Sequence, residues 1–244
     1  MSKVLIITGG GRGIGHCTAI GAAKQGWDVC VNYVGNDERA MQTVKLVEEA
    51  GARAIAVKAD VTKEEDVVRL FETTDRELGV LSGLVNSAGI VGPSGRVDEL
   101  KAADLTPLWL LNITATLICS REAIKRMSTK HGGKGGAIVH LSSAASHLGT
   151  PGATVPYAAS KGAVDSLNWG MAQEVAAEGI RVNSVSPGVI DTEIQPAGRV
   201  EEIGPKLPMR RVGQPEEVAN AILWLLSDEA SYVAGTKINV SGAR

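Results

Sequence analysis

The chain has 244 residues, of which 44% are hydrophobic and 21% charged, and its formal net charge at pH 7 is −2. This length and composition suit one α/β domain with a single large core. Charges of both signs are interspersed without a block of Lys or Arg, which argues against a nucleic-acid partner. The short apolar run at the N-terminus and the absence of 18 consecutive apolar residues predict a cytoplasmic protein without a membrane segment.

The cysteines and histidines give no metal or disulfide signal. Cys17, Cys30 and Cys119 are an odd set without CxxC spacing, and the four histidines show no HxH or HxxxH pattern. We therefore expect no metal site, and we interpret the cysteines as small buried apolar residues.

Short apolar runs alternate with longer helical patterns along the chain. Each run is apolar throughout, which suits strands of a parallel sheet that are buried on both faces and joined by helical crossovers. The sequence therefore predicts one α/β domain over residues 1–244, a doubly wound sheet covered by helices on both faces. The predicted strands are 4–8, 28–32, 53–58, 83–86, 137–141, 181–186 and 237–240, and the predicted helices lie near 14–25, 37–50, 64–78, 101–127, 158–178, 199–203 and 215–227.

Residues 187–208 are rich in Gly and Pro and lack strong periodicity. Long irregular connections in compact domains tend to be functional. We expect a lid over a ligand in this part of the chain, at residues 188–210.

The first predicted strand runs into Gly9-Gly10-Gly11-Arg12-Gly13-Ile14-Gly15 and then into a helix. Glycines allow a tight turn and a close approach of backbone amides to a pyrophosphate, whose charge the helix N-terminus stabilises. The spacing differs from the common GxGxxG, and a purely structural turn is the alternative. The strand–turn–helix context favours a dinucleotide site.

The end of the second predicted strand indicates which dinucleotide binds. NAD sites usually carry an acidic residue there for the ribose 2′-hydroxyl, whereas this strand ends at Asn32 and Tyr33 and the next carboxylates begin a helix. Arg12 in the glycine turn could pair with a 2′-phosphate. We therefore favour NADP(H) over NAD(H), with a solvated Arg12 as the alternative.

Tyr157 and Lys161 stand four residues apart at the start of an apolar helix, so they can share one helix face. At about 4 Å and an effective dielectric of about 20, an ammonium and a phenolate attract by roughly 4 kcal/mol. The sequence thus predicts a phenol with a lowered pKa that exchanges a proton with an alcohol or carbonyl. An ordinary surface pair is the alternative.

Together these motifs give the chain a family resemblance from end to end. The residues Thr8 to Gly15, Asn86-Ser87-Ala88-Gly89, Asn112, Ser143, Tyr157-x3-Lys161 and Pro187-Gly188 resemble, in this order, the short-chain dehydrogenase/reductase family. The similarity is to the subgroup with 3-oxoacyl-[acyl-carrier-protein] reductases and glucose 1-dehydrogenases. It implies a Rossmann-like fold with a seven-stranded parallel sheet.

The resemblance also implies roles for individual residues. Tyr157 is the expected general acid/base, Lys161 lowers its pKa and holds the nicotinamide ribose, Ser143 binds the substrate oxygen, and Asn112 completes a proton relay. The expected cofactor-binding residues are Gly9, Gly11, Arg12, Gly13, Ile14, Gly15, Asn32, Tyr33, Asp60, Val61, Asn86, Ala88, Gly89, Tyr157, Lys161, Pro187, Gly188, Val189, Ile190 and Thr192.

The chain departs from the family pattern in two places. Ser87 stands where the family usually has a second Asn, which keeps the turn and removes one side-chain amide. Ser142 and Ser143 precede Tyr157 by 15 and 14 residues, whereas 13 is frequent in the family. We assign Ser143 from its place after the predicted strand 137–141 and keep Ser142 as the alternative.

These patterns predict an oxidoreductase that transfers hydride between NADP(H) and a ketone, a β-keto compound or the corresponding alcohol. The pocket walls expected at 91–93, 144–145, 154–155 and the lid are small or apolar, although Arg199, Arg210 and Arg211 could bind an anion. An NAD-dependent sugar or alcohol dehydrogenase and a non-catalytic nucleotide-binding regulator are the alternatives.

The resemblance further implies a homotetramer assembled through the helices near 101–127 and 158–178. Apolar residues in these helices spread over more than one face, which indicates a second buried surface.

Overall fold

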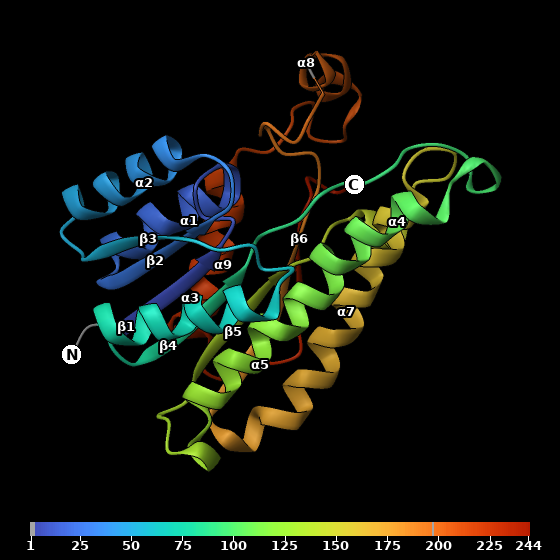
Figure 1. Cartoon of the computed structure of the whole chain (residues 1–244). Helices are drawn as coiled ribbons and strands as arrows, with labels where there is room; N and C mark the ends of the chain where they lie inside the picture. The colour runs from blue at the N-terminus through green and yellow to red at the C-terminus, as the bar shows by residue number, and fades with distance from the viewer. Residues whose placement is uncertain (1–2, 197) are drawn as a thin grey trace.

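A parallel seven-stranded sheet forms the centre of the molecule (Figure 1), in a computed structural model that describes residues 3–196 and 198–244. The order β3-β2-β1-β4-β5-β6-β7 and the parallel pairing of all neighbours confirm the predicted Rossmann-like α/β fold. The strands are β1 (Lys3–Thr8), β2 (Trp27–Tyr33), β3 (Ala54–Lys58), β4 (Leu81–Asn86), β5 (Gly136–Leu141), β6 (Ile180–Pro187) and β7 (Lys237–Val240).

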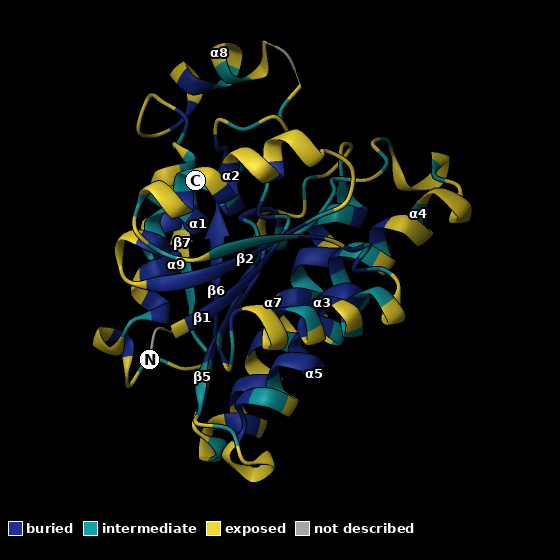
Figure 2. Ribbon diagram, turned by 60° about the vertical axis from the view of Figure 1, so that its left-hand side comes forward, coloured by how far each residue is buried: buried dark blue, intermediate teal, exposed yellow. Residues whose placement is uncertain are grey.

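Helices cover both faces of this sheet. In the described residues, α1, α2 and α9 pack together on one face, and α3, α5 and α7 pack on the other. Figure 2 shows buried strands between helices whose outer sides are exposed. The α-helices are α1 (Gly13–Lys24), α2 (Asp37–Glu49), α3 (Glu64–Glu77), α4 (Ala102–Trp109), α5 (Ala115–Met127), α6 (Ala145–Leu148), α7 (Val155–Val175), α8 (Arg199–Ile203) and α9 (Pro215–Leu226).

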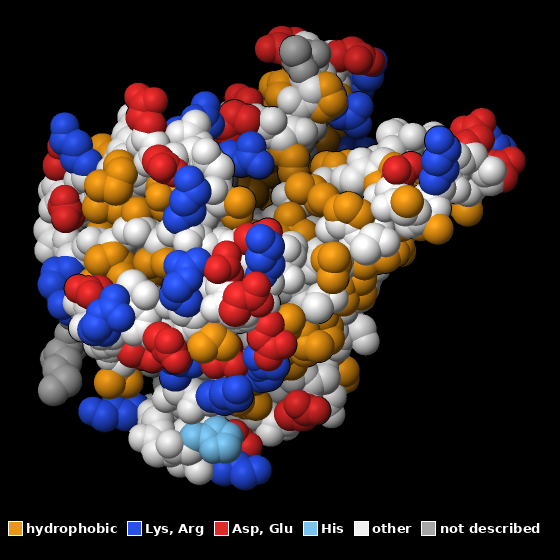
Figure 3. Space-filling view, viewed as in Figure 1, with side chains coloured by type: hydrophobic (Ala, Val, Ile, Leu, Met, Phe, Trp, Pro, Cys, Tyr) orange, Lys and Arg blue, Asp and Glu red, His pale blue; other side chains and the backbone are white. Residues whose placement is uncertain are grey.

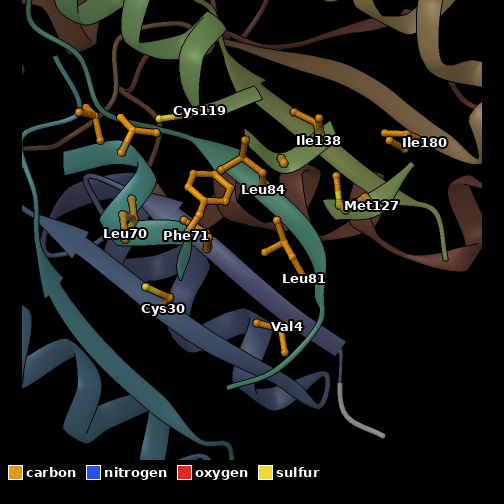
Figure 4. Packing of buried hydrophobic residues seen from close by; sticks show 14 of the residues in the cluster. Val4, Cys30, Leu70, Phe71, Leu81, Leu84, Cys119, Met127, Ile138 and Ile180 are labelled. Carbon is orange, nitrogen blue, oxygen red and sulfur yellow. The ribbon is translucent and has the colours of Figure 1, made fainter. Parts of the chain in front are cut away.

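The sheet divides the apolar core into two clusters. Phe71, Leu84, Met127 and Ile138 belong to the cluster between the sheet and α3, α5 and α7 (Figure 4), and none of the four exposes any measurable surface. Aromatic residues make up only 3% of the sequence, so aliphatic side chains fill most of this space. A continuous aliphatic core on both faces holds the carboxyl ends of the strands in register, which is where α/β folds bind ligands.

The helix predicted over 101–127 is interrupted. Its axis runs through α4, a π-helical turn at Leu110–Thr114 and α5. π turns widen a helix and often occur at functional sites. Asn112 lies inside this turn, so the widened segment determines where its side chain points.

The combined run Ala102–Met127 is long and apolar enough to span a membrane by length and composition, and 28% of its best window is buried in the protein. In the fold it belongs to the outer helical layer, where α5 contacts α3, α7 and β4. Its outward side exposes Leu110 and Leu117.

The irregular segment 188–210 contains α8 and a separate small apolar cluster. Val189, Leu207 and Val212 form this cluster, with Val200 and Ile203 packed against it. Figure 1 shows α8 standing away from the sheet, above the carboxyl ends of the strands. The predicted lid thus lies where a ligand could bind, and Ala197 falls outside the described residues.

Candidate active site

The glycine turn between β1 and α1 fits a bound pyrophosphate. Gly9 and Gly13 have positive φ angles of 65° and 51°, and a Cβ atom at Gly15 would lie 2.5 Å from the carbonyl oxygen of Gly9. Arg12 at the N-cap provides no side-chain cap, and the first turn of α1 has no acidic residue. The helix N-terminus therefore keeps its positive character for an anion.

Asn32 at the end of β2 supports this turn. It is buried, and its amide nitrogen donates to Ala59 O at 2.9 Å while its amide oxygen accepts from Gly9 N at 3.4 Å. The Asn32 side chain bonds to the protein's own backbone, so we expect it to support cofactor binding indirectly, by positioning Gly9. Tyr33 beside it is partly exposed.

The 2′-phosphate end of the predicted site contains two arginines and one carboxylate. The Arg39 guanidinium in α2 forms an ion pair with Glu193, which belongs to the lid. A hydrogen bond from its own backbone amide and the Arg39 pair hold the pKa of Glu193 below its usual value, and Arg12 contributes a weaker attraction. Sequence reasoning considered Arg12 and missed Arg39 and Glu193, which are distant in sequence.

A groove of about 480 Å³ lies on the outer side of the glycine turn. It runs between α1 and the start of α9, and its carboxylates make it unsuited to phosphate. Its lining residues are Gly13, His16, Cys17, Asp191, Thr192, Glu193, Gln214, Pro215 and Glu216.

The turn Asn86-Ser87-Ala88-Gly89 after β4 faces the glycine turn. The Thr8 hydroxyl accepts hydrogen bonds from Ser87 N at 3.0 Å and Ala88 N at 3.1 Å. A Cβ at Gly9 would lie 3.1 Å from the Cα of Ala88, so the two turns are in close contact. Backbone amides and Thr8 hold this turn, which explains why Ser87 can replace the usual Asn.

Asp60 and Val61 follow β3 at the same edge of the sheet. Val61 is buried, and the Asp60 carboxylate accepts from Thr62 N at 3.1 Å and Thr62 Oγ1 at 2.7 Å. The carboxylate therefore closes a local turn, and cofactor binding by Asp60 and Val61 stays a prediction.

Asn112 ties the π turn to the strand end at β4. Its amide nitrogen donates to Ile90 O at 2.9 Å and to Ser160 Oγ at 3.0 Å, and its amide oxygen accepts from Ile90 N at 3.0 Å. A Cβ at Gly89 would lie 3.2 Å from that oxygen and 3.6 Å from Lys161 Nζ. Asn112 is thus close to Lys161, as its predicted role requires.

Tyr157, Ser143 and Lys161 come together between β5 and α7. Ser143 is close enough to the Tyr157 phenol to act on its pKa. Lys161 Nζ lies 5.8 Å from the centre of the Tyr157 ring and donates to Leu141 O at 2.7 Å. The arrangement offers a phenol and a serine hydroxyl to one substrate oxygen.

The pKa of Tyr157 differs from the expectation of a phenol acidified by Lys161. Burial raises the Tyr157 pKa above its usual value, and Ser143 offsets part of this rise. The expected lowering is not seen, because Lys161 Nζ points to Leu141 O and lies over the ring face. At neutral pH Tyr157 is therefore the protonated acid.

Ser142, the alternative to Ser143, is buried and turned away from Tyr157. Its hydroxyl donates to Asp165 Oδ1 at 2.5 Å, and Asp165 Oδ2 accepts from Lys237 Nζ at 2.8 Å. The geometry therefore favours Ser143 for substrate binding. Asp165 and Lys237 are further residues that sequence reasoning missed, since their pairing depends on the position of the edge strand β7.

A buried histidine lies beneath the site. His140 in β5 has its Nδ1 3.1 Å from Asn86 Nδ2, and its Nε2 has no partner among the described residues. Burial lowers the His140 pKa to about 4, and the Lys161 ammonium adds to this effect. His140 is therefore neutral at pH 7.

The chain after β6 forms the other side of the cleft. A Cβ at Gly188 would lie 2.8 Å from the Cα of Ser241, so Gly188 lets this segment pass β7 closely. Val189 and Ile190 are buried, and a Cβ at Gly13 would lie 3.3 Å from Thr192 Cγ2. Thr192 thus borders the glycine turn, on the side where the predicted cofactor would cross. Pro187, the last residue of β6, is buried.

The remaining candidates on loops have ordinary partners. Arg211 forms two hydrogen bonds of 2.7 Å with Glu217, and Arg210 donates to Pro205 O at 2.9 Å. His147 is exposed in α6. These contacts give Arg210 and Arg211 structural roles, whereas anion binding by Arg199 stays a prediction.

A strand–turn–helix cradle for a dinucleotide next to a Tyr-Ser-Lys-Asn cluster defines a class of enzymes, and the comparisons with known proteins agree. The family model described as "Enoyl-(Acyl carrier protein) reductase" matches residues 9–242. The chain belongs to the short-chain dehydrogenase/reductase family and is an oxidoreductase.

Alignments with related bacterial proteins cover almost the whole chain. It is 47% identical to the uncharacterised oxidoreductase YgfF of Escherichia coli over 99% of both chains. It is 35% identical to glucose 1-dehydrogenase 2 of Bacillus subtilis, over 98% of this chain and 93% of the relative. It is also 35% identical to a 3-oxoacyl-[acyl-carrier-protein] reductase of Synechocystis, over 99% and 96%.

Among solved structures, a short-chain dehydrogenase of Burkholderia cenocepacia in complex with NADP is 30% identical, with a TM-score of 0.91. The match covers 98% of this chain and 96% of the other.

Proposed function

We propose that this protein is an NADP(H)-dependent reductase that transfers hydride between the cofactor and a carbonyl compound or secondary alcohol, with reduction of a ketone or β-keto compound by NADPH as its main reaction. The observation that carries the proposal is the buried Lys161, whose Nζ lies 5.8 Å from the centre of the Tyr157 ring, next to Ser143 at the end of β5. A binding module would need the glycine turn but not this cluster.

The side chains of the cluster divide the chemistry between them. When bound, the nicotinamide supplies the hydride. Tyr157 donates its proton to the carbonyl oxygen, and Ser143 donates a hydrogen bond to the same oxygen as negative charge develops there. Lys161 stabilises the phenolate that remains and holds the ribose hydroxyls, while Asn112 connects Lys161 to a proton relay.

The preference for NADP(H) rests on charge. The end of β2 presents Asn32 and Tyr33, and Asp37 pairs with Lys58 at 2.9 Å. Arg12 and Arg39 provide positive charge near the glycine turn. A ribose 2′-phosphate suits this surface better than a 2′-hydroxyl that needs an acidic partner.

The substrate class follows from the pocket walls. Ala144 and Ala145 are buried small residues next to Ser143, and the lid contributes its own apolar cluster. A moderately apolar ketone or β-keto compound suits such walls. The Synechocystis relative, named as a 3-oxoacyl-[acyl-carrier-protein] reductase, supports the β-keto class.

Binding of NADPH and NADH to the purified protein, measured by fluorescence titration, tests the cofactor assignment. We expect tighter binding of NADPH, and Arg12→Ala should remove the difference. Arg76→Ala is the matched control, because Arg76 pairs with Glu77 at the far end of α3. Equal or tighter binding of NADH would contradict the assignment.

Assays of turnover with candidate substrates then distinguish the proposed reductase from the two alternative functions. Oxidation of a sugar or alcohol with NAD would favour the dehydrogenase alternative, which the Bacillus subtilis relative supports by its name. Tight cofactor binding without turnover of any ketone, β-keto ester or sugar would favour a nucleotide-binding regulator. A cytoplasmic location stays a prediction from the sequence, and a homotetramer stays a prediction from the resemblance.

A further inference from the structure

We propose that Asp165 is a positioning residue that keeps Lys161 charged during the reaction, and that Lys237 on the edge strand sets the strength of this effect. The proposal rests on the proposed function, because it concerns the lysine of that site. It adds two residues that act through Lys161 and touch neither cofactor nor substrate.

The geometry places Asp165 at the junction of three elements. Tyr157, Lys161 and Asp165 follow each other at intervals of four residues, so they lie along one face of α7. The Asp165 carboxylate accepts from Ser142 at the end of β5 and from Lys237 in β7. Both of its oxygens are thereby fixed, and its side chain is 23% exposed.

Ser142 connects this carboxylate to the site. The Ser142 hydroxyl also lies 3.4 Å from Lys161 O, and its neighbour in sequence is Ser143. Lys237 Nζ lies 3.4 Å from Ser146 Oγ in α6, the helix that follows Ser143. The network therefore holds both sides of the segment that presents Ser143 to the substrate.

The electrostatic surroundings of Lys161 make Asp165 its principal counter-charge. Burial lowers the pKa of Lys161 to about 8, and Asp165 opposes this shift. From the same helix Tyr157 is neutral, and from β5 His140 is neutral at pH 7. Without Asp165, burial would lower the pKa of Lys161 with no carboxylate to oppose it.

The other elements against this part of α7 bring no close opposing charge within the described residues. The π turn Leu110–Thr114 is uncharged, β6 turns Ser184 and Ser186 to this side, and α4 has an exposed Asp104. In α6, His147 is exposed. Lys237 is the remaining charged neighbour, and it reaches Lys161 through Asp165.

Substitutions of the two partners of this ion pair should therefore shift the pKa of Lys161 in opposite directions. Asp165→Asn removes the attraction and lowers the Lys161 pKa by about one unit. Lys237→Met leaves the Asp165 carboxylate without its cation, so the pKa of Lys161 rises by about half a unit. A purely structural ion pair would give no shift or shifts of one sign.

The shifts are measured by NMR titration of protein labelled with ¹³C-lysine, with the Lys161 signal assigned through Lys161→Arg. The matched controls are Lys3→Met and Asp228→Asn, a second Lys–Asp pair of 3.0 Å at the opposite end of the sheet. Neither control should move the Lys161 titration.

The pH profile of NADPH-dependent ketone reduction gives the second readout. Its alkaline limb should move to lower pH in Asp165→Asn and to higher pH in Lys237→Met. Opposite NMR shifts in a protein that reduces no ketone would support this electrostatic role and count against the proposed function. NMR shifts of the same sign, or none, would overturn the role of Asp165 even in an active enzyme. If Asp165→Asn does not fold, Lys237→Met alone decides: a Lys161 pKa that does not rise in this variant also overturns the proposed role of Asp165.

Discussion

Tyr157 carries the proton in the proposed reaction, and its loss should affect the chemistry alone. Tyr157→Phe keeps the buried ring and removes the hydroxyl. We expect kcat for ketone reduction to fall by about 10²–10⁴-fold, because general acid catalysis contributes that range. NADPH affinity, measured by fluorescence titration, should change little. A variant that keeps most of its activity would show that another group donates the proton.

Glu193 forms an ion pair with the Arg39 guanidinium, which is one of the cations that we expect to bind a 2′-phosphate. Glu193→Gln frees Arg39 and should tighten NADPH binding by up to about fivefold, since a half-exposed ion pair contributes at most about 1 kcal/mol. NADH binding should not change. Glu202→Gln is the control, because Glu202 pairs with Lys206 in the same lid. A loss of NADPH affinity in Glu193→Gln would contradict this view of the pair.

His140 should make the folded state sensitive to acid. Its pKa is about 4 in the fold and 6.5 ordinarily, so the unfolded chain takes up the proton first as the pH falls. The contribution to stability is complete above pH 6.5 and decreases toward pH 4, by about 3 kcal/mol in total.

Urea unfolding between these pH values measures this dependence. His140→Asn should have a shallower pH dependence than the wild type, whereas the exposed His147→Gln should follow the wild type. Parallel curves for His140→Asn and the wild type would show that other groups cause the acid sensitivity.

At the scale of elements, the glycine turn brings the start of α1 into close contact with the backbone that follows β1. Gly15→Ala would bring a Cβ to 2.5 Å from the Gly9 carbonyl oxygen, so the turn must shift. We expect a loss of about 1–3 kcal/mol in the free energy of unfolding, together with weaker NADPH binding. Gly170→Ala, in open space on α7, is the control, and thermal unfolding of both variants is the measurement.

Most elements could be predicted from the sequence because their apolar patterns are strong. All seven strands occur at the predicted places: β7 has the predicted bounds, β1 begins one residue earlier than predicted, and β6 is one residue longer at each end. Continuous apolar runs leave little freedom when a strand is buried on both faces. The glycine turn and Tyr157–Lys161 were predictable for a similar reason, since their geometry depends on local spacing.

The parts that were missed depend on contacts between distant segments. The π turn around Asn112 interrupts a helix whose side-chain pattern is continuous, and Asn112 bonds to Ile90 across the cleft. The four-residue helix α6 is too short to have a period. Asp165 meets Lys237 only because β7 pairs Lys237 with Ser184. No spacing within one segment contains this information.

At the scale of the whole molecule, an apolar surface runs along α4, α5 and α7, on the right in Figure 3. Leu110, Leu117 and Trp169 are exposed there, with Trp169 60% exposed. Such a surface is typical of a subunit interface. The predicted tetramer would bury it.

Leu117→Glu should therefore lower the oligomeric state measured by light scattering after size-exclusion chromatography. A charge in a buried apolar contact costs more than most interfaces can offset. Val80→Glu is the control, because Val80 is an exposed apolar residue just before β4 and belongs to none of α4, α5 and α7. An unchanged assembly in Leu117→Glu would place the interface elsewhere.

The lid has its own apolar cluster, built from Val189, Leu207 and Val212 and separate from the two clusters that hold the sheet. The base of the lid is nevertheless tied to the main core, because Ile190 belongs to the cluster that packs α1 and α9 against the sheet. We expect substitutions in 198–210 to reshape the substrate side of the cleft while β5, α7 and the glycine turn stay folded, because Val200, Ile203 and Leu207 pack in this small cluster. For protein engineering, residues 198–210 are therefore the segment to exchange: grafting this segment from relatives onto the unchanged sheet and glycine turn should change which substrates the protein accepts.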